Sequence, residues 1–197
     1  DRRTAIVQEM KRVNMEFEFF DAIDGRNNYE GLRQYCYKKG IIGDRGAKEL
    51  SPGALGCLLS HRAIFEKEWT MQNDKNYWIL IMEDDIRFAP NLDMQKYIDN
   101  WPSRLNIVKL AYWNDYRPNY KKEIGNPYFV ELTDQTCSCL CYAVHSSCFS
   151  FLTTHKYDTA IDIIVDYPMH GCKTPVDVPQ SQEFYRLGAH IDALFEG

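Results

Sequence analysis

The stretch that most constrains the fold is YWILIMEDDIRF, residues 77–88, in which an apolar run leads directly into three carboxylates. Residues 77–82 are apolar at nearly every position, as expected for a central β-strand covered on both faces. Glu83, Asp84 and Asp85 follow without interruption. Like charges repel, and apolar surroundings increase the cost of ionising them. The three side chains therefore either spread into solvent at a turn or collect something cationic.

A divalent cation is one candidate for what the carboxylates collect. Carboxylate oxygens suit Mg²⁺ or Mn²⁺, which proteins commonly hold with one or two carboxylates together with substrate phosphates. In open α/β sheets, ligands bind beyond the carboxyl ends of the strands. On an extended backbone Glu83 and Asp85 would point the same way. The pattern therefore resembles a metal–diphosphate clamp, and a solvated turn is the alternative because acidic triplets are common at strand ends.

The rest of the chain alternates helical and strand-like patterns, which favours an α/β layered fold. Ser51 is expected to cap a helix that has Pro52 at its first position. Residues 27–50 are polar and rich in glycine, which predicts a mobile loop around a short helix. The patterns predict helices near residues 4–13, 30–37, 52–65, 92–101, 147–154 and 159–165, and strands near residues 17–22, 77–82, 106–111, 128–132 and 138–144.

Composition limits the classes of protein to which the chain can belong. Its 197 residues, with 45% apolar and 26% charged, suit one soluble globular domain. A formal net charge of -5 argues against a general nucleic-acid binder, which usually presents a basic face. No apolar run approaches the roughly 20 residues needed to span a bilayer. The oligomeric state leaves no signature in the sequence.

The chain has seven cysteines, so at least one cannot pair within it. Cys137, Cys139 and Cys141 alternate in TCSCLC, which on a strand places them on one face. This spacing does not match a zinc site, and we interpret the three as small buried residues of a core strand. A reducing compartment, the cytoplasm rather than the lumen of the endoplasmic reticulum, is favoured, and an oxidising one with some disulfides is also compatible.

Four motifs occur in an order that resembles glycosyltransferase family 25. They are FFDAIDG (19–25), LSPGALGCLLSH (50–61), ILIMEDDIRF (79–88) and CYAVHSSCFSFL (141–152). The family includes lipopolysaccharide galactosyltransferases and enzymes that glycosylate collagen hydroxylysine. Its usual opening strand would precede Asp1, so we expect residues 1–197 to form a single glycosyltransferase domain that lacks this strand.

The resemblance implies a GT-A-type fold, an α/β/α sandwich around a mostly parallel central sheet. It also implies an inverting, metal-dependent transfer of a hexose from a UDP-sugar to a hydroxyl on a glycan or on protein hydroxylysine. UDP-galactose and UDP-glucose are the leading donors. The expected cofactor is Mn²⁺, or Mg²⁺ in its place, bound to the donor diphosphate and neutralising charge on the leaving group.

The resemblance further suggests roles around the acidic triplet and the two earlier motifs. Asp85 is the expected direct metal ligand, with Glu83 or Asp84 holding the ribose or the waters of the metal. Asp24 could accept a hydrogen bond from the uracil or ribose, and a local Asx turn with Gly25 is the alternative. The remaining candidates for the donor site are Ser60 and His61, for which a structural role within the fold is the alternative.

The residues expected to bind or deprotonate the acceptor come later in the chain. Asp177, in TPVDV, is the expected base that removes the proton from the acceptor hydroxyl, with Asp115 in reserve. Trp113 and Tyr116 offer flat faces on which a sugar could stack, although core packing explains Trp113 equally well. His190 could complete the metal shell.

Two positions depart from the family pattern. Ala54 replaces a glutamate in the Gly-Glu-x-Gly-Cys motif, and His145 stands where a serine is more usual. Because of the first departure, a catalytically inactive binding module with the same fold is an alternative hypothesis. A metal-dependent phosphoester hydrolase is a further alternative, but it would normally show additional Asp and His ligands on several strand ends.

Overall fold

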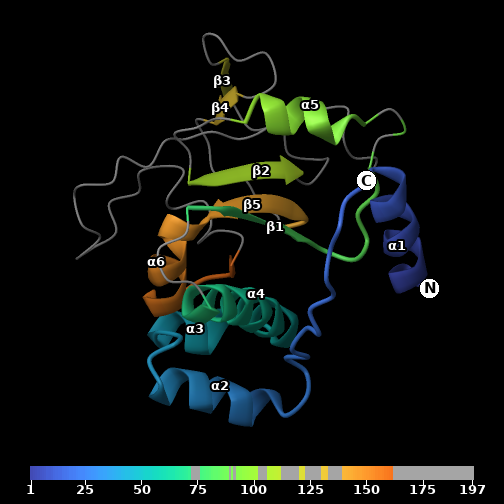
Figure 1. Ribbon diagram of the computed structural model, residues 1–197. Coiled ribbons are helices and arrows are strands. Elements are labelled where there is room, and N and C mark those ends of the chain that lie inside the picture. Colours follow the sequence, from blue (N-terminus) through green and yellow to red (C-terminus); the bar gives the residue numbers. More distant parts are fainter. Residues whose placement is uncertain are drawn as a thin grey trace. The chain divides into compact units, whose positions relative to one another are not determined.

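The computed structural model describes residues 1–71, 76–88, 90, 92–101, 106–111, 120–122, 130–132 and 139–161 (Figure 1). These residues fall into two compact units. The first takes residues 1–18 and 78–145, and the second takes residues 19–77 and 146–161. The chain therefore passes between the units more than once, and each unit is described by itself below.

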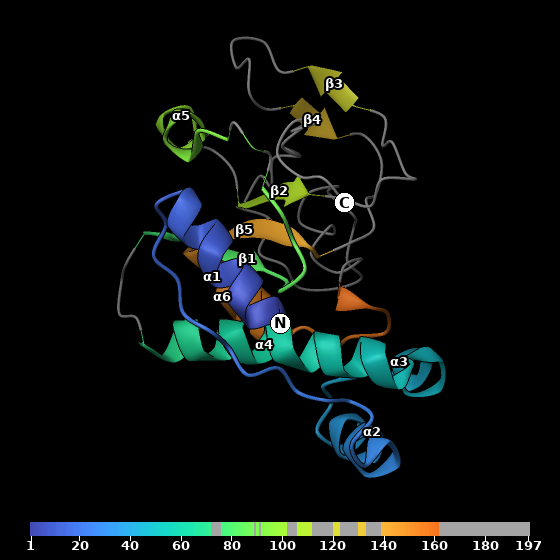
Figure 2. The same cartoon turned by 90° about the vertical axis from the view of Figure 1, so that its right-hand side faces the viewer.

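The first unit contains helices and a small sheet. β5 lies between β1 and β2 in a three-stranded sheet, and β3 pairs with β4 in a separate ribbon (Figures 1 and 2). The described elements of this unit are α1 (Arg2–Arg12), β1 (Trp78–Met82), α5 (Met94–Asp99), β2 (Ile107–Ala111), β3 (Tyr120–Lys122), β4 (Val130–Leu132) and β5 (Cys141–His145).

The mixed α/β composition is confirmed, but the expected mostly parallel sheet is wrong for the described strands. β5 runs antiparallel to both of its neighbours, so that Ala143 pairs with Leu80 on one side and with Val108 on the other. β1 and β2 consequently run in the same direction without being adjacent. The reason lies in the order of the strands along the chain. β1 and β2 come first and are not paired with each other, and β5 later enters between them in the opposite direction.

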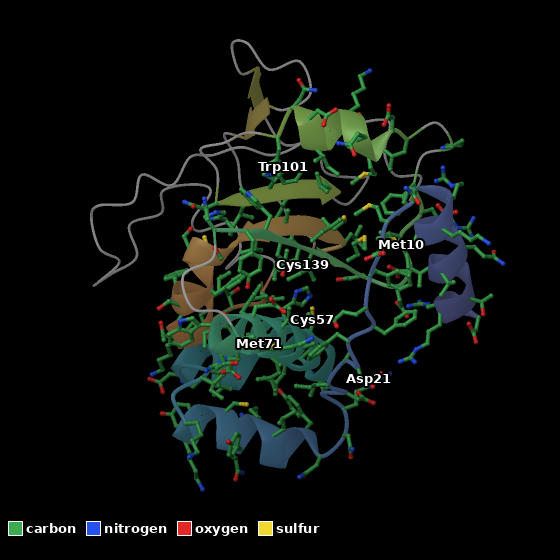
Figure 3. The ribbon with its side chains drawn as sticks, in the orientation of Figure 1. Met10, Asp21, Cys57, Met71, Trp101 and Cys139 are labelled. Carbon is green, nitrogen blue, oxygen red and sulfur yellow. The ribbon has the colours of Figure 1, made fainter. Side chains whose placement is uncertain are left out.

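One face of the three-stranded sheet carries an apolar cluster. Val108, Cys141 and Ala143 are buried there, and side chains at and next to α5 pack against them. The ring of Trp101, labelled in Figure 3, meets the ring of Trp78 edge to face with centroids 5.4 Å apart. Both rings are partly buried against the cluster, and their packing removes apolar surface from water, which favours folding.

Helix α1 packs its apolar stripe on the segment that follows β1. Ile6 and Met10 cluster with Ile86 and Phe88, and Met10 is labelled in Figure 3. Polar contacts extend this packing, since the Arg12 guanidinium donates to the Phe88 carbonyl at 2.8 Å. The α1 helix thereby fixes the path of the chain just beyond the acidic triplet.

The second unit is helical. α4, capped by the Ser51 hydroxyl at the Ala54 N–H as expected, packs against α6, and α2 packs against α3. Figure 2 shows α4 as the longest helix of this unit. The described elements are α2 (Tyr29–Lys38), α3 (Asp44–Glu49), α4 (Pro52–Met71), the 3₁₀ turn η1 (Ser146–Cys148) and α6 (Phe149–Thr154).

Helix α3 lies in the stretch that the sequence predicts as loop, and a distant segment caps it. Its N-cap residue is Gly43, which has no side chain to satisfy the first helical N–H groups. Asp158 fills this role, accepting the Gly46 N–H at 3.2 Å. The Gly43 N–H in turn donates to the Tyr157 carbonyl at 2.9 Å. The capping interaction therefore spans more than a hundred residues of sequence.

Most other predicted elements are confirmed within a few residues, and one is wrong. Residues 17–22 form no strand, although their apolar residues alternate. Phe17 and Phe19 are 37% and 44% exposed, so the alternation does not mark a buried strand face. The predicted helix at 159–165 lies largely outside the described residues, whereas residues 130–132 of the predicted strand at 128–132 form β4.

The described cysteines agree with the interpretation as small core residues. Cys139 and Cys141 are 4% and 0% exposed, whereas Cys137 lies outside the described residues. Burial raises the pKa of the Cys148 thiol to about 12. No disulfide joins the described cysteines. Among the described residues, no helix is both long and apolar enough to cross a membrane.

The cap of α3 yields a test. Replacing Asp158 with Ala removes the acceptor at the start of the helix, and we expect the free energy of unfolding to fall by about 1 kcal/mol. Asp158→Asn keeps an acceptor oxygen and is the matched control, expected to lose less than half as much. Denaturant unfolding followed by circular dichroism measures both. Equal losses in the two variants would contradict capping as the role of Asp158.

Candidate functional site

The acidic triplet begins where the β1 ladder ends. The Glu83 N–H still donates to the Leu140 carbonyl at 2.8 Å, so Glu83 continues the strand by one position. Asp84 and Asp85 follow in a turn. The carboxylates therefore follow the carboxyl end of β1, as the sequence predicts.

The structure corrects how the three carboxylates are arranged. The expectation that Glu83 and Asp85 point the same way rested on an extended backbone, and the turn at Asp84 and Asp85 removes that premise. Asp84 and Asp85 instead face one cation. The Arg2 guanidinium lies 3.0 Å from Asp84 Oδ1 and 3.7 Å from Asp85 Oδ2. The pair that converges is thus Asp84 with Asp85.

Arg2 is a site residue that the sequence analysis missed. It comes from the first turn of α1, and its side chain is 66% exposed. An ion pair this open to solvent contributes roughly 0–1 kcal/mol, because water and salt screen it. The contact is therefore weak, and it shows that the two carboxylates can share a positive charge. Only the spatial packing of α1, and no local pattern, could have revealed it.

The other donor-side candidates belong to the second unit. Asp24 closes a local Asx turn, accepting the Arg26 N–H at 3.0 Å and the Arg26 Nε–H at 2.9 Å. The hydrogen bond from the Arg26 side chain, together with that from its backbone, holds the pKa of the Asp24 carboxyl below its ordinary value. The structure supports the local-turn interpretation, and a role toward a nucleotide stays a prediction.

Two glycines explain why the FFDAIDG and GALGC motifs occur together. A Cβ on Gly25 would lie 1.9 Å from the Pro52 carbonyl oxygen and 2.6 Å from the Gly56 nitrogen. A Cβ on Gly56 would lie 2.6 Å from the Ile23 carbonyl oxygen. The turn and helix α4 therefore meet backbone to backbone, and both positions require glycine.

Ser60 fastens the same turn to α4. Its hydroxyl accepts the Ile23 N–H at 2.8 Å and donates to the Gly56 carbonyl at 2.7 Å. The side chain is buried, so both interactions are shielded from water. This structural role is the alternative foreseen for Ser60. His61 lies beside it on α4 and is also buried, at 6% exposure, which is consistent with a histidine held within the fold.

His145 ends β5 and is half-buried. Its ring meets the Trp78 ring at a centroid distance of 5.1 Å, and burial lowers its pKa. Its position in the aromatic cluster gives this departure from the family pattern a packing role. The remaining candidates lie outside the described residues; they are Asp115, Asp177, Trp113, Tyr116 and His190.

A comparison with family models decides which family these motifs represent. The model of glycosyltransferase family 25, described as a lipopolysaccharide biosynthesis protein family, matches residues 1–160. The chain belongs to glycosyltransferase family 25. The match covers both units and contains all four motifs, so the family resemblance expected from the sequence is confirmed.

Relatives agree with this assignment. A Haemophilus influenzae protein named as a candidate glycosyltransferase is 30% identical over 84% of this chain and 57% of its own length. A glycosyltransferase 25 family member of Aedes aegypti is 33% identical over 46% of this chain and 15% of its own. A procollagen lysyl hydroxylase and glycosyltransferase of Acanthamoeba polyphaga mimivirus is 31% identical over 49% and 12%. The family 25 chain thus spans 57% or less of the length of each relative.

The contact between the turn and α4 can be tested with a matched pair of glycines. In Gly25→Ala the new Cβ meets backbone atoms that cannot move aside cheaply, and we expect the free energy of unfolding to fall by about 1–3 kcal/mol. Gly53→Ala makes the same change on α4 where nothing lies within 4 Å, and helix propensity should make it neutral or stabilising by up to about 1 kcal/mol. Thermal and denaturant unfolding measure both, and a Gly25→Ala protein as stable as the wild type would contradict the close approach.

The Asx turn makes a pH prediction. Because the pKa of Asp24 is lowered in the folded state, the turn stabilises the fold above the ordinary carboxyl pKa and loses this contribution as pH falls through the lowered one. Arg26→Ala should raise the pKa of Asp24 toward its ordinary value, as followed by NMR titration. Arg45→Ala, which removes another exposed arginine of the same unit, should leave it unchanged. An unmoved Asp24 titration in Arg26→Ala would exclude Arg26 as the cause.

Proposed function

We propose that this family 25 chain is the catalytic part of an inverting glycosyltransferase. It transfers a hexose, galactose or glucose, from a UDP-sugar to a hydroxyl on a glycan or on protein hydroxylysine. Family membership supports a transferase. The name of the mimivirus relative supports a collagen-type acceptor as one possibility, and the lipopolysaccharide description of the family supports a glycan as the other.

The single observation that carries the donor site is the convergence of Asp84 and Asp85 on one cation. Both carboxylates lie within 4 Å of the Arg2 guanidinium, and their side chains are 53% and 45% exposed. Two accessible carboxylates that already share a positive charge are the arrangement that a diphosphate-bound metal requires. An apolar strand holds them at the sheet edge, so little ordering is needed when a ligand arrives.

The residues present fit Mn²⁺ or Mg²⁺, because hard carboxylate oxygens are the ligands that these ions prefer. When bound, the ion would neutralise the charge that develops on the departing nucleoside diphosphate. Asp85 would ligate it directly, Asp84 would share the charge, and Glu83 would orient the ribose or the surrounding waters. Arg2 would leave the carboxylates as the ion binds, at little cost given how exposed the ion pair is.

The acceptor side extends the proposal to residues outside the described part of the chain. Asp177, or Asp115 in its place, would take the proton of the acceptor hydroxyl. Trp113 and Tyr116 would stack on the acceptor, and His190 would complete the metal shell. A GT-A-type arrangement for the whole protein also belongs to the proposal, supported by the common direction of β1 and β2 and by the carboxylates that follow β1.

The decisive assay measures release of UDP from UDP-galactose and UDP-glucose, with and without Mn²⁺, in the presence of glycan and hydroxylysine acceptors. We expect metal-dependent turnover with one of the two donors. Absence of both turnover and UDP binding would favour the alternative suggested by Ala54, a catalytically inactive binding module. Hydrolysis of simple phosphoesters without sugar transfer would favour the hydrolase.

The metal assignment predicts the effect of one substitution. Asp85→Asn should weaken Mn²⁺-dependent UDP binding at least about tenfold, because a neutral amide is a poorer ligand for a divalent ion. Isothermal titration calorimetry measures the affinity. Asp93→Asn is the matched control, since Asp93 caps α5 in the same unit and asparagine caps equally well.

Arg2→Ala gives the second arm of this test. Removing the guanidinium takes away the cation that competes for Asp84 and Asp85, so Mn²⁺ affinity should hold or increase. Unchanged affinity in Asp85→Asn would exclude Asp85 as a ligand, whatever the result for Arg2.

A further inference from the structure

A glutamate and an arginine of α1 hold the backbone that leads away from the acidic triplet. The Glu9 carboxylate accepts the Phe88 N–H at 3.3 Å, and the Arg12 guanidinium donates to the Phe88 carbonyl at 2.8 Å. Arg12 also donates to the Pro90 carbonyl at 3.1 Å and to the Glu9 carboxylate at 2.9 Å. Both backbone polar groups of Phe88 are therefore bound by one pair of side chains, which we call the Glu9–Arg12 clamp.

The clamp is better protected from water than the ion pair at the other end of the helix. The side chains of Glu9 and Arg12 are 25% and 35% exposed, against 66% for that of Arg2. The hydrogen bond from the Arg12 side chain, together with that from the Phe88 N–H, lowers the pKa of the Glu9 carboxyl. Hydrogen bonds that involve charged groups are the stronger ones, and partial burial limits their screening. The clamp is thus a stronger contact than the Arg2 ion pair.

The acidic turn is consequently anchored on both sides. On its entry side, the Glu83 N–H continues the β1 ladder by donating to the Leu140 carbonyl. On its exit side, Ile86 and Phe88 are buried against the apolar stripe of α1, which Figure 1 shows beside this segment. Only the two aspartates of the triplet lie between these anchored stretches. A turn this short, held at both ends, presents its carboxylates in few arrangements, which lowers the cost of ordering them around a ligand.

We propose that Glu9 and Arg12 are positioning residues for the donor site, because their hold on Phe88 keeps the acidic turn in a conformation that suits a divalent ion. The role rests on the proposed function, since it requires that the turn binds the ion of the donor. Such an ion demands well-defined ligand geometry, and a turn that spends part of its time in other conformations binds it less tightly. Both residues act through the backbone of Phe88 and not on the substrate.

The distribution of contacts along α1 indicates which part of the helix gives way to a ligand. Arg2, in the first turn, makes the exposed ion pair with the acidic turn, and Arg12, in the last turn, belongs to the clamp. Ile6 and Met10, between them in sequence, pack on the segment that follows the triplet. An ion that enters the turn therefore needs to displace only the Arg2 side chain, while the rest of α1 stays in place and continues to hold the chain.

The Mn²⁺ requirement of UDP binding tests this role. UDP binding to the whole chain is titrated with Mn²⁺, and the Mn²⁺ concentration that gives half-maximal binding is compared between variants. Glu9→Ala and Arg12→Ala should raise it about tenfold, which corresponds to the loss of one hydrogen bond to a charged group. Saturating Mn²⁺ should restore the full amount of bound UDP. Residues that supported only the stability of the fold would instead lower the amount of protein able to bind and leave the half-maximal concentration unchanged.

A conservative variant and two matched controls sharpen the test. Glu9→Gln keeps an oxygen that can accept the Phe88 N–H, and its Mn²⁺ requirement should stay within about threefold of the wild type. Lys11→Ala removes the same charge as Arg12→Ala from the neighbouring, exposed position of α1 and should leave the Mn²⁺ requirement unchanged. Glu30→Ala breaks a glutamate–arginine pair of the same i, i+3 spacing on α2 and should leave it unchanged as well.

The outcomes separate the positioning role from the proposed function. An unchanged Mn²⁺ requirement in both alanine variants, with a wild type that binds UDP, would overturn the role of the clamp alone. A wild type that binds no UDP at any Mn²⁺ concentration would overturn the proposed function, and the role of the clamp with it.

A third variant decides if neither alanine variant folds. Arg12→Lys keeps a positive charge that can pair with Glu9, but a single ammonium group cannot reach both backbone carbonyls as the planar guanidinium does. It should raise the Mn²⁺ requirement by about threefold or more. A folded Arg12→Lys protein with the Mn²⁺ requirement of the wild type would overturn the positioning role.

Discussion

The first unit depends on β5, which is hydrogen-bonded along both of its edges. Residues 141–144 are all buried, and their backbone groups pair with β1 on one side and β2 on the other. Removing this strand would leave the backbone donors and acceptors of both neighbours unpaired within an apolar setting. The acidic triplet directly follows β1, one of the two strands that β5 joins, and owes its position to this pairing.

The second unit depends on a contact of a different kind. Gly25 and Gly56 bring two backbone segments so close that no side chain fits between them, and Ser60 fastens the approach with two hydrogen bonds. The family motifs that contain these residues therefore reflect a requirement for close packing of two backbone segments. A motif shared with an enzyme family need not consist of catalytic residues, because the geometry that supports a site is as demanding as the site itself.

Local patterns predicted the elements whose causes are local. The Ser51-Pro52 helix start, a strand at β1 and the carboxylates at its end were all predicted, since capping residues and apolar runs leave signatures in adjacent residues. The place of β1 in the sheet was not, because a central strand covered on both faces was expected, whereas β1 lies at the edge of the three described strands and only Ile81 of its five residues is fully buried. Helix α3 escaped prediction because Asp158, far along the chain, supplies its cap. The antiparallel sheet was not predicted because the direction of neighbouring strands depends on which later segment pairs between β1 and β2. The expectation that Glu83 and Asp85 point the same way was wrong because it assumed an extended backbone, whereas the chain turns at Asp84 and Asp85.

The charge arrangement at the end of β1 shows how three like charges can be tolerated. Asp84 and Asp85 turn toward Arg2 at an exposed edge, whereas the Glu83 N–H continues the ladder of β1. The triplet is therefore divided, because two carboxylates share one positive charge and the third stands one position earlier on the chain. Since the Arg2 side chain is exposed, its ion pair with the two aspartates is weak and can give way to a ligand. The proposed donor site would thus exchange this arginine for a metal ion without disturbing the strand that precedes the carboxylates.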